Sequence, residues 1–169
     1  MAIVLVGFMG SGKTSVGRIL ARFLDMPWVD LDKKIEKEIG MPIHKLFKKF
    51  GEDAFRVKES QLLLKELKKD VVLSTGGGVV IRENNRRTII KKSEYCIYLT
   101  SSFHVLMRRI RKNKKNIRPL ATNNSYKDLE KLFEERKVLY KEVATIVVQA
   151  NKSSPAIVAK EIMQRMEKA

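Results

Sequence analysis

The residue types and spacing best suited to chemistry lie near the N-terminus, in the segment GFMGSGKT from Gly7 to Thr14. This segment matches the pattern G-x-x-x-x-G-K-[ST] of a phosphate-binding loop at every specified position. Its glycines allow backbone N–H groups to form a nest around phosphate oxygens, and Lys13 can reach the β- and γ-phosphates. The Thr14 hydroxyl is free to bind Mg²⁺. The segment therefore predicts a nucleotide-binding site.

The alternative interpretation of this segment is an ordinary flexible turn. A turn would need neither a lysine nor a hydroxyl at the start of the next helix, and both are present here. The flanking sequence also fits a phosphate-binding loop, because an apolar run, 2–6, precedes it and an amphipathic helical pattern, 16–24, follows it. A buried strand would then lead into the loop and a helix would lead out of it.

Two acids, Asp30 and Asp32, follow the second expected strand, 27–29. In a parallel sheet, ligands bind outside the carboxyl ends of the strands, so both carboxylates should lie near Lys13 and any Mg²⁺. Alternatively, Asp32 caps the helix that follows it. The third strand, 71–74, is followed by hydroxyls and glycines instead of an acid, which disfavours ATPases of the motor and helicase kind.

Three glycines and two arginines complete the candidate site. The glycines, 76–78, would let the backbone approach a ligand closely and offer N–H donors, with a floppy turn as the alternative. Arg136 continues the apolar stripe of its helix, where a guanidinium needs an anionic partner. Arg56 begins another stripe and has Glu59 three residues later, although a surface ion pair between them fits the periodicity equally well. These arginines predict a ligand that carries an anionic group.

The elements that must position these residues alternate along the chain. Apolar strands separated by helices predict a parallel sheet with helices on both faces, in one domain of 169 residues. The expected strands are 2–6, 27–29, 71–74, 95–99 and 145–148. The first expected helix follows the phosphate-binding loop and ends near 24, and the later ones cover 33–39, 43–50, 52–69, 83–91, 102–111, 125–140 and 155–166. Gly51 should break the chain between two of them, Ser101 or Ser102 should cap the helix at 102–111, and Pro155 should lie in the first turn of the last helix.

The chain carries 35 basic and 19 acidic residues, and its net charge of +16 could serve nucleic acid, anionic lipid or a phosphorylated ligand. Much of the excess lies in 108–118, where seven cations occur without an acid. Their mutual repulsion predicts a solvated, mobile loop. The absence of aromatic residues from this segment weakens the case for nucleic acid, because bases would have no side chains on which to stack.

The remaining composition, 44% hydrophobic and 32% charged, is typical of a soluble globular protein. Cys96 lies in a strand-like run and should be a small buried apolar group, and His44 and His104 lack companions at metal-binding spacing. The first apolar run is too short for a signal peptide, and no run approaches a transmembrane length. We therefore expect a cytoplasmic protein with no membrane partner.

Taken together, these residues resemble the shikimate kinase family over nearly the whole chain. The resemblance is carried by 7–14, Asp30-Leu31-Asp32, Phe55-Arg56 with Glu59, 76–78, Arg118-Pro119-Leu120 and Arg136. It implies a P-loop, nucleoside-monophosphate-kinase-like, three-layer α/β/α fold whose five-stranded parallel sheet has the order 2-3-1-4-5. A single kinase domain, 1–169, would contain a substrate-binding segment at about 31–60 and a lid at about 109–123. The reaction would transfer the γ-phosphoryl group of ATP to the 3-hydroxyl of shikimate, in aromatic amino acid (chorismate) biosynthesis.

The resemblance also implies a nucleotide site. Its ATP-binding residues would be Gly10, Ser11, Gly12, Lys13, Thr14, Ser15, Arg109, Arg118 and Pro155. Thr14 and, through water, Asp30 would hold Mg²⁺, which acts with ATP as co-substrate. Arg118 would reach over the phosphates from the lid, and Arg109 and Pro155 would enclose the adenine.

The acceptor site follows from the same resemblance. Asp32 would bind the accepting hydroxyls and act as the base. Arg56, Arg136 and the backbone of Gly77 and Gly78 would hold the substrate. The catalytic residues would be Lys13, Asp32 and Arg118.

The expected partners are ATP and shikimate, with no nucleic acid, and the protein should be a monomer. The nearest alternative is another small-molecule kinase of the same fold that acts on a sugar acid or a nucleotide. A nucleic-acid-stimulated P-loop ATPase is a more distant alternative, which the high charge keeps open.

Overall fold

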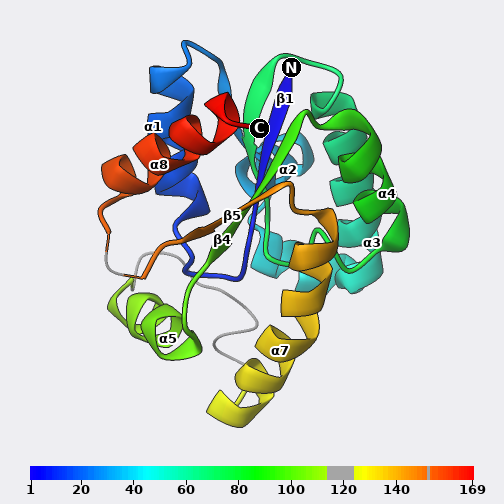
Figure 1. The fold of residues 1–169 in the computed structure, drawn as a ribbon. Coiled ribbons are helices and arrows are strands. Elements are labelled where there is room, and N and C mark those ends of the chain that lie inside the picture. Colours follow the sequence, from blue (N-terminus) through cyan, green and yellow to red (C-terminus); the bar gives the residue numbers. More distant parts are fainter. Residues whose placement is uncertain (114–123, 152) are drawn as a thin grey trace.

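Five parallel strands form the central sheet, in the order β2-β3-β1-β4-β5 (Figure 1). The computed structural model describes residues 1–113, 124–151 and 153–169. The strands are β1 (Ala2–Val6), β2 (Trp28–Asp30), β3 (Val71–Ser74), β4 (Tyr95–Thr100) and β5 (Ile146–Gln149). The α/β fold class and the strand order expected from the sequence are thus confirmed. Because the strands are parallel, the carboxyl ends of β1, β2 and β3, where the candidate site residues lie, share one edge of the sheet.

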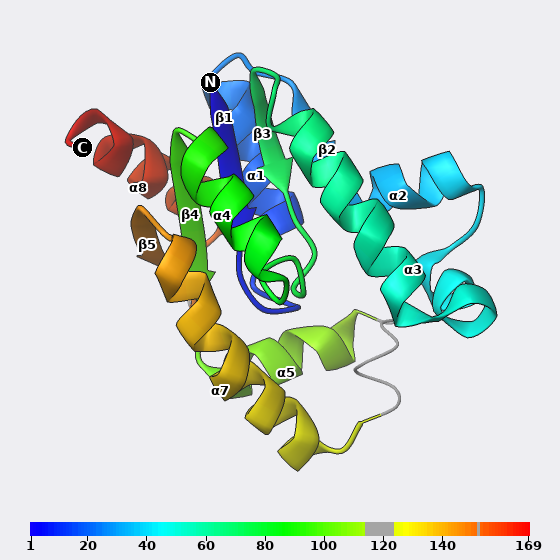
Figure 2. The same cartoon turned by 90° about the vertical axis from the view of Figure 1, so that its right-hand side faces the viewer.

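Helices cover both faces of the sheet, as Figures 1 and 2 show. The described helices are α1 (Lys13–Phe23), α2 (Leu31–Ile39), α3 (Ile43–Glu66), α4 (Glu83–Lys92), α5 (Phe103–Lys112), α7 (Tyr126–Val143) and α8 (Pro155–Glu167). Side chains alternate along a strand, so β1 contributes Val4 and Val6 to one core and Ile3 and Leu5 to the other. The first core packs against α3, α4 and α7, and the second packs against α1 and α8. This two-sided burial explains the uninterrupted apolar run of β1.

Several helix boundaries differ from the predicted ones. α3 spans the helices expected at 43–50 and 52–69, and the predicted break between them is confirmed, because Gly51 has the non-helical angles φ 81° and ψ 169°. The proposed cap at Asp32 is wrong, because α2 begins at Leu31, two residues earlier than predicted, and the Asp30 carboxylate accepts from the backbone N–H of Lys33 at 3.2 Å. Ser102 precedes α5, yet its hydroxyl makes no capping hydrogen bond. Pro155 lies in the first turn of α8, as predicted.

Two other sequence features can be placed in the fold. Cys96 is buried in β4, and burial raises the pKa of its thiol to about 12, so it behaves as a small apolar side chain. Across the described ranges, no helix is long and apolar enough to cross a membrane. The basic segment 108–118 begins in α5, but residues 114–123 of the expected lid lie outside the described residues.

Candidate active site

The phosphate-binding loop connects the end of β1 to the start of α1. Gly10 and Gly12 have φ values of 81° and 94°, a left-handed backbone that favours glycine at both positions. The Lys13 side chain is buried and turns back into the loop, where its Nζ donates to the carbonyl oxygens of Gly7 at 2.7 Å and Phe8 at 3.0 Å. The loop therefore holds one cation at the mouth of the sheet, where phosphates would bind.

The Thr14 hydroxyl and the Asp30 carboxylate meet beside this loop. Thr14 Oγ1 donates to Asp30 Oδ2 at 3.0 Å, although the two residues come from α1 and from the end of β2. The other Asp30 oxygen caps α2, which fixes the orientation of the carboxylate. The structure thus brings together the two residues that the sequence predicted as metal ligands.

Asp32 is partly exposed as a residue, yet its Oδ1 atom is buried and has no hydrogen-bond partner among the described residues. Burial raises the pKa of Asp32 to about 7, and the nearby carboxylates of Glu59 and Asp30 add to this shift. The cations of Lys13 and Arg56 oppose it. A carboxyl group with a pKa near neutrality can accept and release a proton at physiological pH, which suits a general base.

Each of the three glycines after β3 leaves room for one charged side chain. A Cβ at Gly76 would lie 2.7 Å from Asp32 Oδ1, one at Gly77 would lie 3.6 Å from Arg136 Nη1, and one at Gly78 would overlap the Arg56 guanidinium. None of the three glycines has the positive φ found at Gly10 or Gly12, so the backbone conformation does not require glycine. Gly76 and Gly78 are needed for space, whereas a Cβ at Gly77 would make ordinary van der Waals contacts. The glycines are where the carboxyl and both guanidiniums converge.

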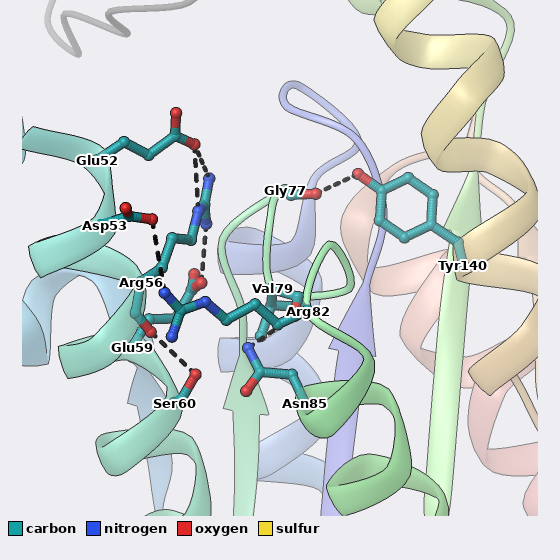
Figure 3. Close-up of polar contacts among 10 residues, drawn as sticks. All are labelled: Glu52, Asp53, Arg56, Glu59, Ser60, Gly77, Val79, Arg82, Asn85 and Tyr140. Atoms are coloured by element: carbon teal, nitrogen blue, oxygen red, sulfur yellow. Dashed lines mark hydrogen bonds and ion pairs between the residues drawn. The ribbon is translucent and has the colours of Figure 1, made fainter.

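Arg56 is buried in this site, so the alternative of a surface ion pair is wrong (Figure 3). Its Nη1 donates to Glu59 Oε1 at 2.8 Å and its Nη2 donates to Glu52 Oε1 at 3.2 Å. Glu59 is fully buried, which raises the pKa of its carboxyl group, while Arg56 opposes the shift. Two acids on the same helix therefore hold the Arg56 fork in one orientation.

Arg136 is also buried, on the face of α7 that the helical periodicity predicted. Its Nε has no hydrogen-bond partner in the described part of the chain, and the guanidinium lies 6.0 Å from the ring centre of Phe8. Burial lowers the pKa of Arg136, which measures the cost of keeping this charge away from water. With Asp32 Oδ1 and Glu59 Oε2, it is one of three buried polar groups at this site left without a full set of partners among the described residues.

A pocket of about 570 Å³ opens beside these side chains. It lies between the kink of α3, at 50–53, and the loop that follows β3, and Arg56, Ile81 and Arg82 line it. Arg82 Nη2 lies 3.7 Å from Asp53 Oδ1 across the pocket (Figure 3). The volume suits a small polar molecule.

A second corner of the site lies on the other side of the phosphate-binding loop. Arg109 Nη1 donates to the Gly10 carbonyl oxygen at 3.3 Å, and its Nη2 donates to the carbonyl oxygens of Ala150 and Asn151. Arg109 thus joins the loop to residues 150 and 151, which follow β5. Pro155, the other residue predicted to enclose adenine, begins α8 four residues after Asn151. Arg118, the third predicted catalytic residue, lies outside the described residues.

Sequence reasoning missed the side chains that hold the glycine loop in place. Tyr140 Oη donates to the Gly77 carbonyl oxygen at 2.5 Å, and Asn85 Nδ2 donates to the Val79 carbonyl oxygen at 2.9 Å (Figure 3). These contacts do not fit the alternative of a floppy turn. Tyr140 carried one usable signal, its position four residues after Arg136 on the same helical face. Nothing in the local sequence marked Asn85.

The raised pKa of Asp32 predicts a pH-dependent stability difference in the ligand-free protein. Between the ordinary Asp pKa of 3.8 and about 7, the folded state binds a proton that the unfolded state lacks, so stability falls as pH rises through this window. The limiting slope is about 1.4 kcal/mol per pH unit. Asp32→Asn removes the charge, so its melting temperature relative to wild type should be higher at pH 8 than at pH 4.5.

Thermal unfolding of the two proteins at both pH values measures this difference. Asp25→Asn, which changes an exposed carboxyl group far from the site, controls for the loss of one charge. A relative melting temperature of Asp32→Asn that does not change with pH would show that Asp32 has an ordinary pKa.

Known proteins with similar sequences belong to the family that the site residues resemble. The family model for shikimate kinase matches residues 9–167. The chain is 42% identical over 166 residues to a shikimate kinase of Enterococcus faecalis, covering 98% of both chains, and 44% identical over 164 residues to one of Streptococcus thermophilus, covering 96% of this chain and 98% of that one. Both matches cover nearly the whole length of the chain.

Solved structures agree with the sequence relatives. A shikimate kinase from Acinetobacter baumannii in complex with shikimate has a TM-score of 0.89 at 32% identity and covers 99% of this chain and 93% of its own. A gluconokinase from Sinorhizobium meliloti has a TM-score of 0.62 at 17% identity, with 99% of this chain and 91% of its own covered, and shares the fold alone. A phosphate-binding loop that faces a carboxyl group and two buried guanidiniums, matched by relatives over nearly the full length, places this chain in the shikimate kinase family.

Proposed function

We propose that this chain transfers the γ-phosphoryl group of ATP to the 3-hydroxyl of shikimate, as the shikimate kinase of the shikimate pathway. The observation that carries the proposal is the convergence, at the glycines after β3, of buried charged groups that lack full sets of partners among the described residues. An acceptor that bears a carboxylate and neighbouring hydroxyls would satisfy both guanidinium and carboxyl groups. The relative from A. baumannii, solved in complex with shikimate, supports this acceptor.

On the acceptor side, Arg136 and Arg56 bind the shikimate carboxylate, because a planar guanidinium fork matches a carboxylate. The backbone N–H groups of Gly77 and Gly78 orient the ring. Asp32 accepts the proton of the attacking hydroxyl, and its pKa of about 7 supports this role. The substrate-binding segment, 31–60, contains both Asp32 and Arg56 and forms the wall of the pocket at the kink of α3.

On the nucleotide side, the segment Gly10, Ser11, Gly12, Lys13, Thr14 and Ser15 binds the phosphates of ATP. Lys13 neutralises charge on the transferring group, since its Nζ already lies within the loop. Arg109 and Pro155 enclose the adenine. The hydrogen bonds of Arg109 to the carbonyl oxygens of Gly10 and Asn151 support its part in this role. By resemblance alone, Arg118 reaches the phosphates from the lid at about 109–123.

The family uses ATP with Mg²⁺, and the residues beside the loop fit this ion. The Thr14 hydroxyl and the Asp30 carboxylate are hard oxygen donors in direct contact, and Mg²⁺ in kinases is bound through one or two such groups together with substrate phosphates. No cluster of three or more His, Cys, Asp or Glu side chains suited to a metal occurs in the described ranges, which agrees with a metal that arrives with the nucleotide. When bound, Mg²⁺ would offset negative charge on the β- and γ-phosphates.

Two further expectations remain predictions, namely a monomeric protein and a cytoplasmic location. The alternatives of a sugar-acid kinase and of a nucleic-acid-stimulated ATPase differ from shikimate kinase in what accelerates ADP release, so one assay separates them.

A coupled assay of ADP release in the presence of Mg²⁺ tests the proposed function. Shikimate should accelerate ADP release by several orders of magnitude over the rate with ATP alone, whereas gluconate, a nucleoside monophosphate and single-stranded DNA should not. The reaction product should carry its phosphate at the 3-position, which ³¹P and ¹H NMR of the product identify. Faster ADP release with any of the other three additions would contradict the proposal.

A further inference from the structure

The Tyr140 hydroxyl lies between two of the groups proposed to bind the acceptor. Tyr140 is fully buried in α7, and its Oη donates to the Gly77 carbonyl oxygen at 2.5 Å (Figure 3). The two residues are 63 positions apart in the chain, so this bond joins α7 directly to the loop after β3. The backbone of Gly77 cannot shift toward or away from α7 without breaking it.

The same hydroxyl faces Arg136, one helical turn earlier on α7. Arg136 Nη1 lies 3.6 Å from the position that a Cβ of Gly77 would occupy, so the guanidinium and this stretch of backbone are neighbours. Burial lowers the pKa of the Arg136 guanidinium, and Tyr140 is close enough to offset part of this decrease. The Tyr140 oxygen therefore bonds to the Gly77 backbone and lies near the Arg136 guanidinium.

A phenol is chemically suited to this place. It has one O–H donor and two acceptor lone pairs, while a guanidinium has only donors and a carbonyl only accepts. With its hydrogen committed to the Gly77 carbonyl, the Tyr140 oxygen is left as an acceptor beside Arg136. Its ring is held by Tyr98, whose ring centre lies 5.2 Å away at an angle of 34°, so the hydroxyl has little freedom to move.

Other side chains fix the far end of the glycine loop. Asn85 donates to the Val79 carbonyl oxygen, and Arg86 Nη1 donates to the Val80 carbonyl oxygen at 2.9 Å. Arg86 is anchored in turn, because its Nε donates to Glu142 Oε1 of α7 at 2.9 Å. These contacts hold the loop downstream of the glycines, whereas in the described part of the chain Tyr140 is the side chain that bonds to Gly77.

We propose that Tyr140 is a positioning residue for the acceptor, whose hydroxyl sets the distance between the Arg136 guanidinium and the Gly77 backbone. The substrate carboxylate and ring then meet two partners that are already aligned, which lowers the cost of ordering them on binding. This inference rests on the proposed function, because it assigns Arg136 and Gly77 to the binding of shikimate. It adds a residue that does not itself touch the substrate.

Tyr140→Phe tests the proposal, since it removes the hydroxyl and keeps the buried ring. The KM for shikimate should rise about three- to tenfold, the effect of one neutral hydrogen bond, while the KM for ATP stays unchanged. Tyr98→Phe is the matched control, because it removes a hydroxyl from the neighbouring and equally buried ring. That control should leave both KM values at the wild-type level.

A double-mutant cycle separates positioning from a merely structural contribution. In the Arg136→Ala background, Tyr140→Phe should raise the KM for shikimate less than it does in wild type, because only the Gly77 backbone is then left for the hydroxyl to position. An unchanged shikimate KM in Tyr140→Phe, an equal rise in Tyr98→Phe, or an equal loss in both backgrounds would each overturn the proposal. Wild-type turnover of shikimate, measured alongside, distinguishes these outcomes from a failure of the proposed function, in which no variant would use shikimate at all.

Discussion

Asp32→Asn should lower kcat by about 10²- to 10⁴-fold while the protein remains folded and still binds both substrates. Asparagine keeps the shape of the side chain but cannot accept the proton of the attacking hydroxyl. The KM values for ATP and shikimate should change little, because the loss concerns a step that occurs only in the transition state. Steady-state kinetics in the ADP-release assay measure both constants.

The pH dependence of the wild-type enzyme provides a second measurement of the same residue. With a pKa of about 7, Asp32 becomes protonated as pH falls, so kcat/KM should decrease on the acidic side of neutrality. Asp32→Asn should lose this acidic limb along with its activity. Retention of full activity by the variant would eliminate Asp32 as the base.

Two variants make the interpretation specific. Lys13→Ala should also abolish phosphoryl transfer, but it should weaken ATP binding as well, because it removes a cation from the phosphate-binding loop. Asp25→Asn, an exposed carboxyl group remote from the site, should keep wild-type kinetics. The melting temperature of Asp32→Asn at pH 8, measured alongside, shows whether the variant is folded under the conditions of the assay.

The second large effect is expected for Arg136→Ala, which should weaken the use of shikimate by roughly ten- to more than a hundredfold. This corresponds to one charge-assisted hydrogen-bonded pair, about 1.5–3 kcal/mol. The KM for ATP should hardly change, because the residues proposed to bind ATP do not include Arg136. Arg136→Lys should recover only part of the loss, since a point charge cannot reproduce a planar fork.

The environment of Arg136 also predicts what the variant does to stability. Its guanidinium is buried, and its Nε has no partner among the described residues, so replacement by alanine removes a desolvation cost along with some packing against Phe8. Its charge also offsets that of the buried Glu59, so the melting temperature of the ligand-free protein should fall only slightly. A fully paired structural arginine would give a larger fall, because its loss would leave partner acids unpaired.

A substrate analogue shows whether Arg136 recognises the carboxylate. Shikimate with its carboxylate reduced to an alcohol should be a poor substrate for wild type, yet Arg136→Ala should lose little further activity with it. Lys131→Ala, an exposed cation on the same helix, serves as the control for a general loss of positive charge. Equal discrimination between shikimate and the alcohol by mutant and wild type would show that Arg136 does not bind the carboxylate.

Features that depend on residues close together along the chain could be predicted from the sequence. The phosphate-binding loop, the alternation of strands and helices and the placement of Arg136 on an apolar face all follow from local spacing, because helical and strand periodicities bring nearby residues onto one surface. The acids after β2 could be assigned to the site for a similar reason, since the carboxyl ends of parallel strands share one edge of the sheet.

Contacts between residues far apart in the sequence could be seen only in the folded structure. Periodicity could not tell a surface ion pair from a buried one at Arg56 and Glu59, because the answer depends on which segments cover α3. The reason for glycine at positions 76 and 78 became visible only when the side chains of Asp32 and Arg56, from two other elements, were found against them. Tyr140 and Gly77 are 63 residues apart, and no local pattern connects them. The sheet brings such residues together, so their contacts depend on the packing of the whole domain and not on spacing in the sequence.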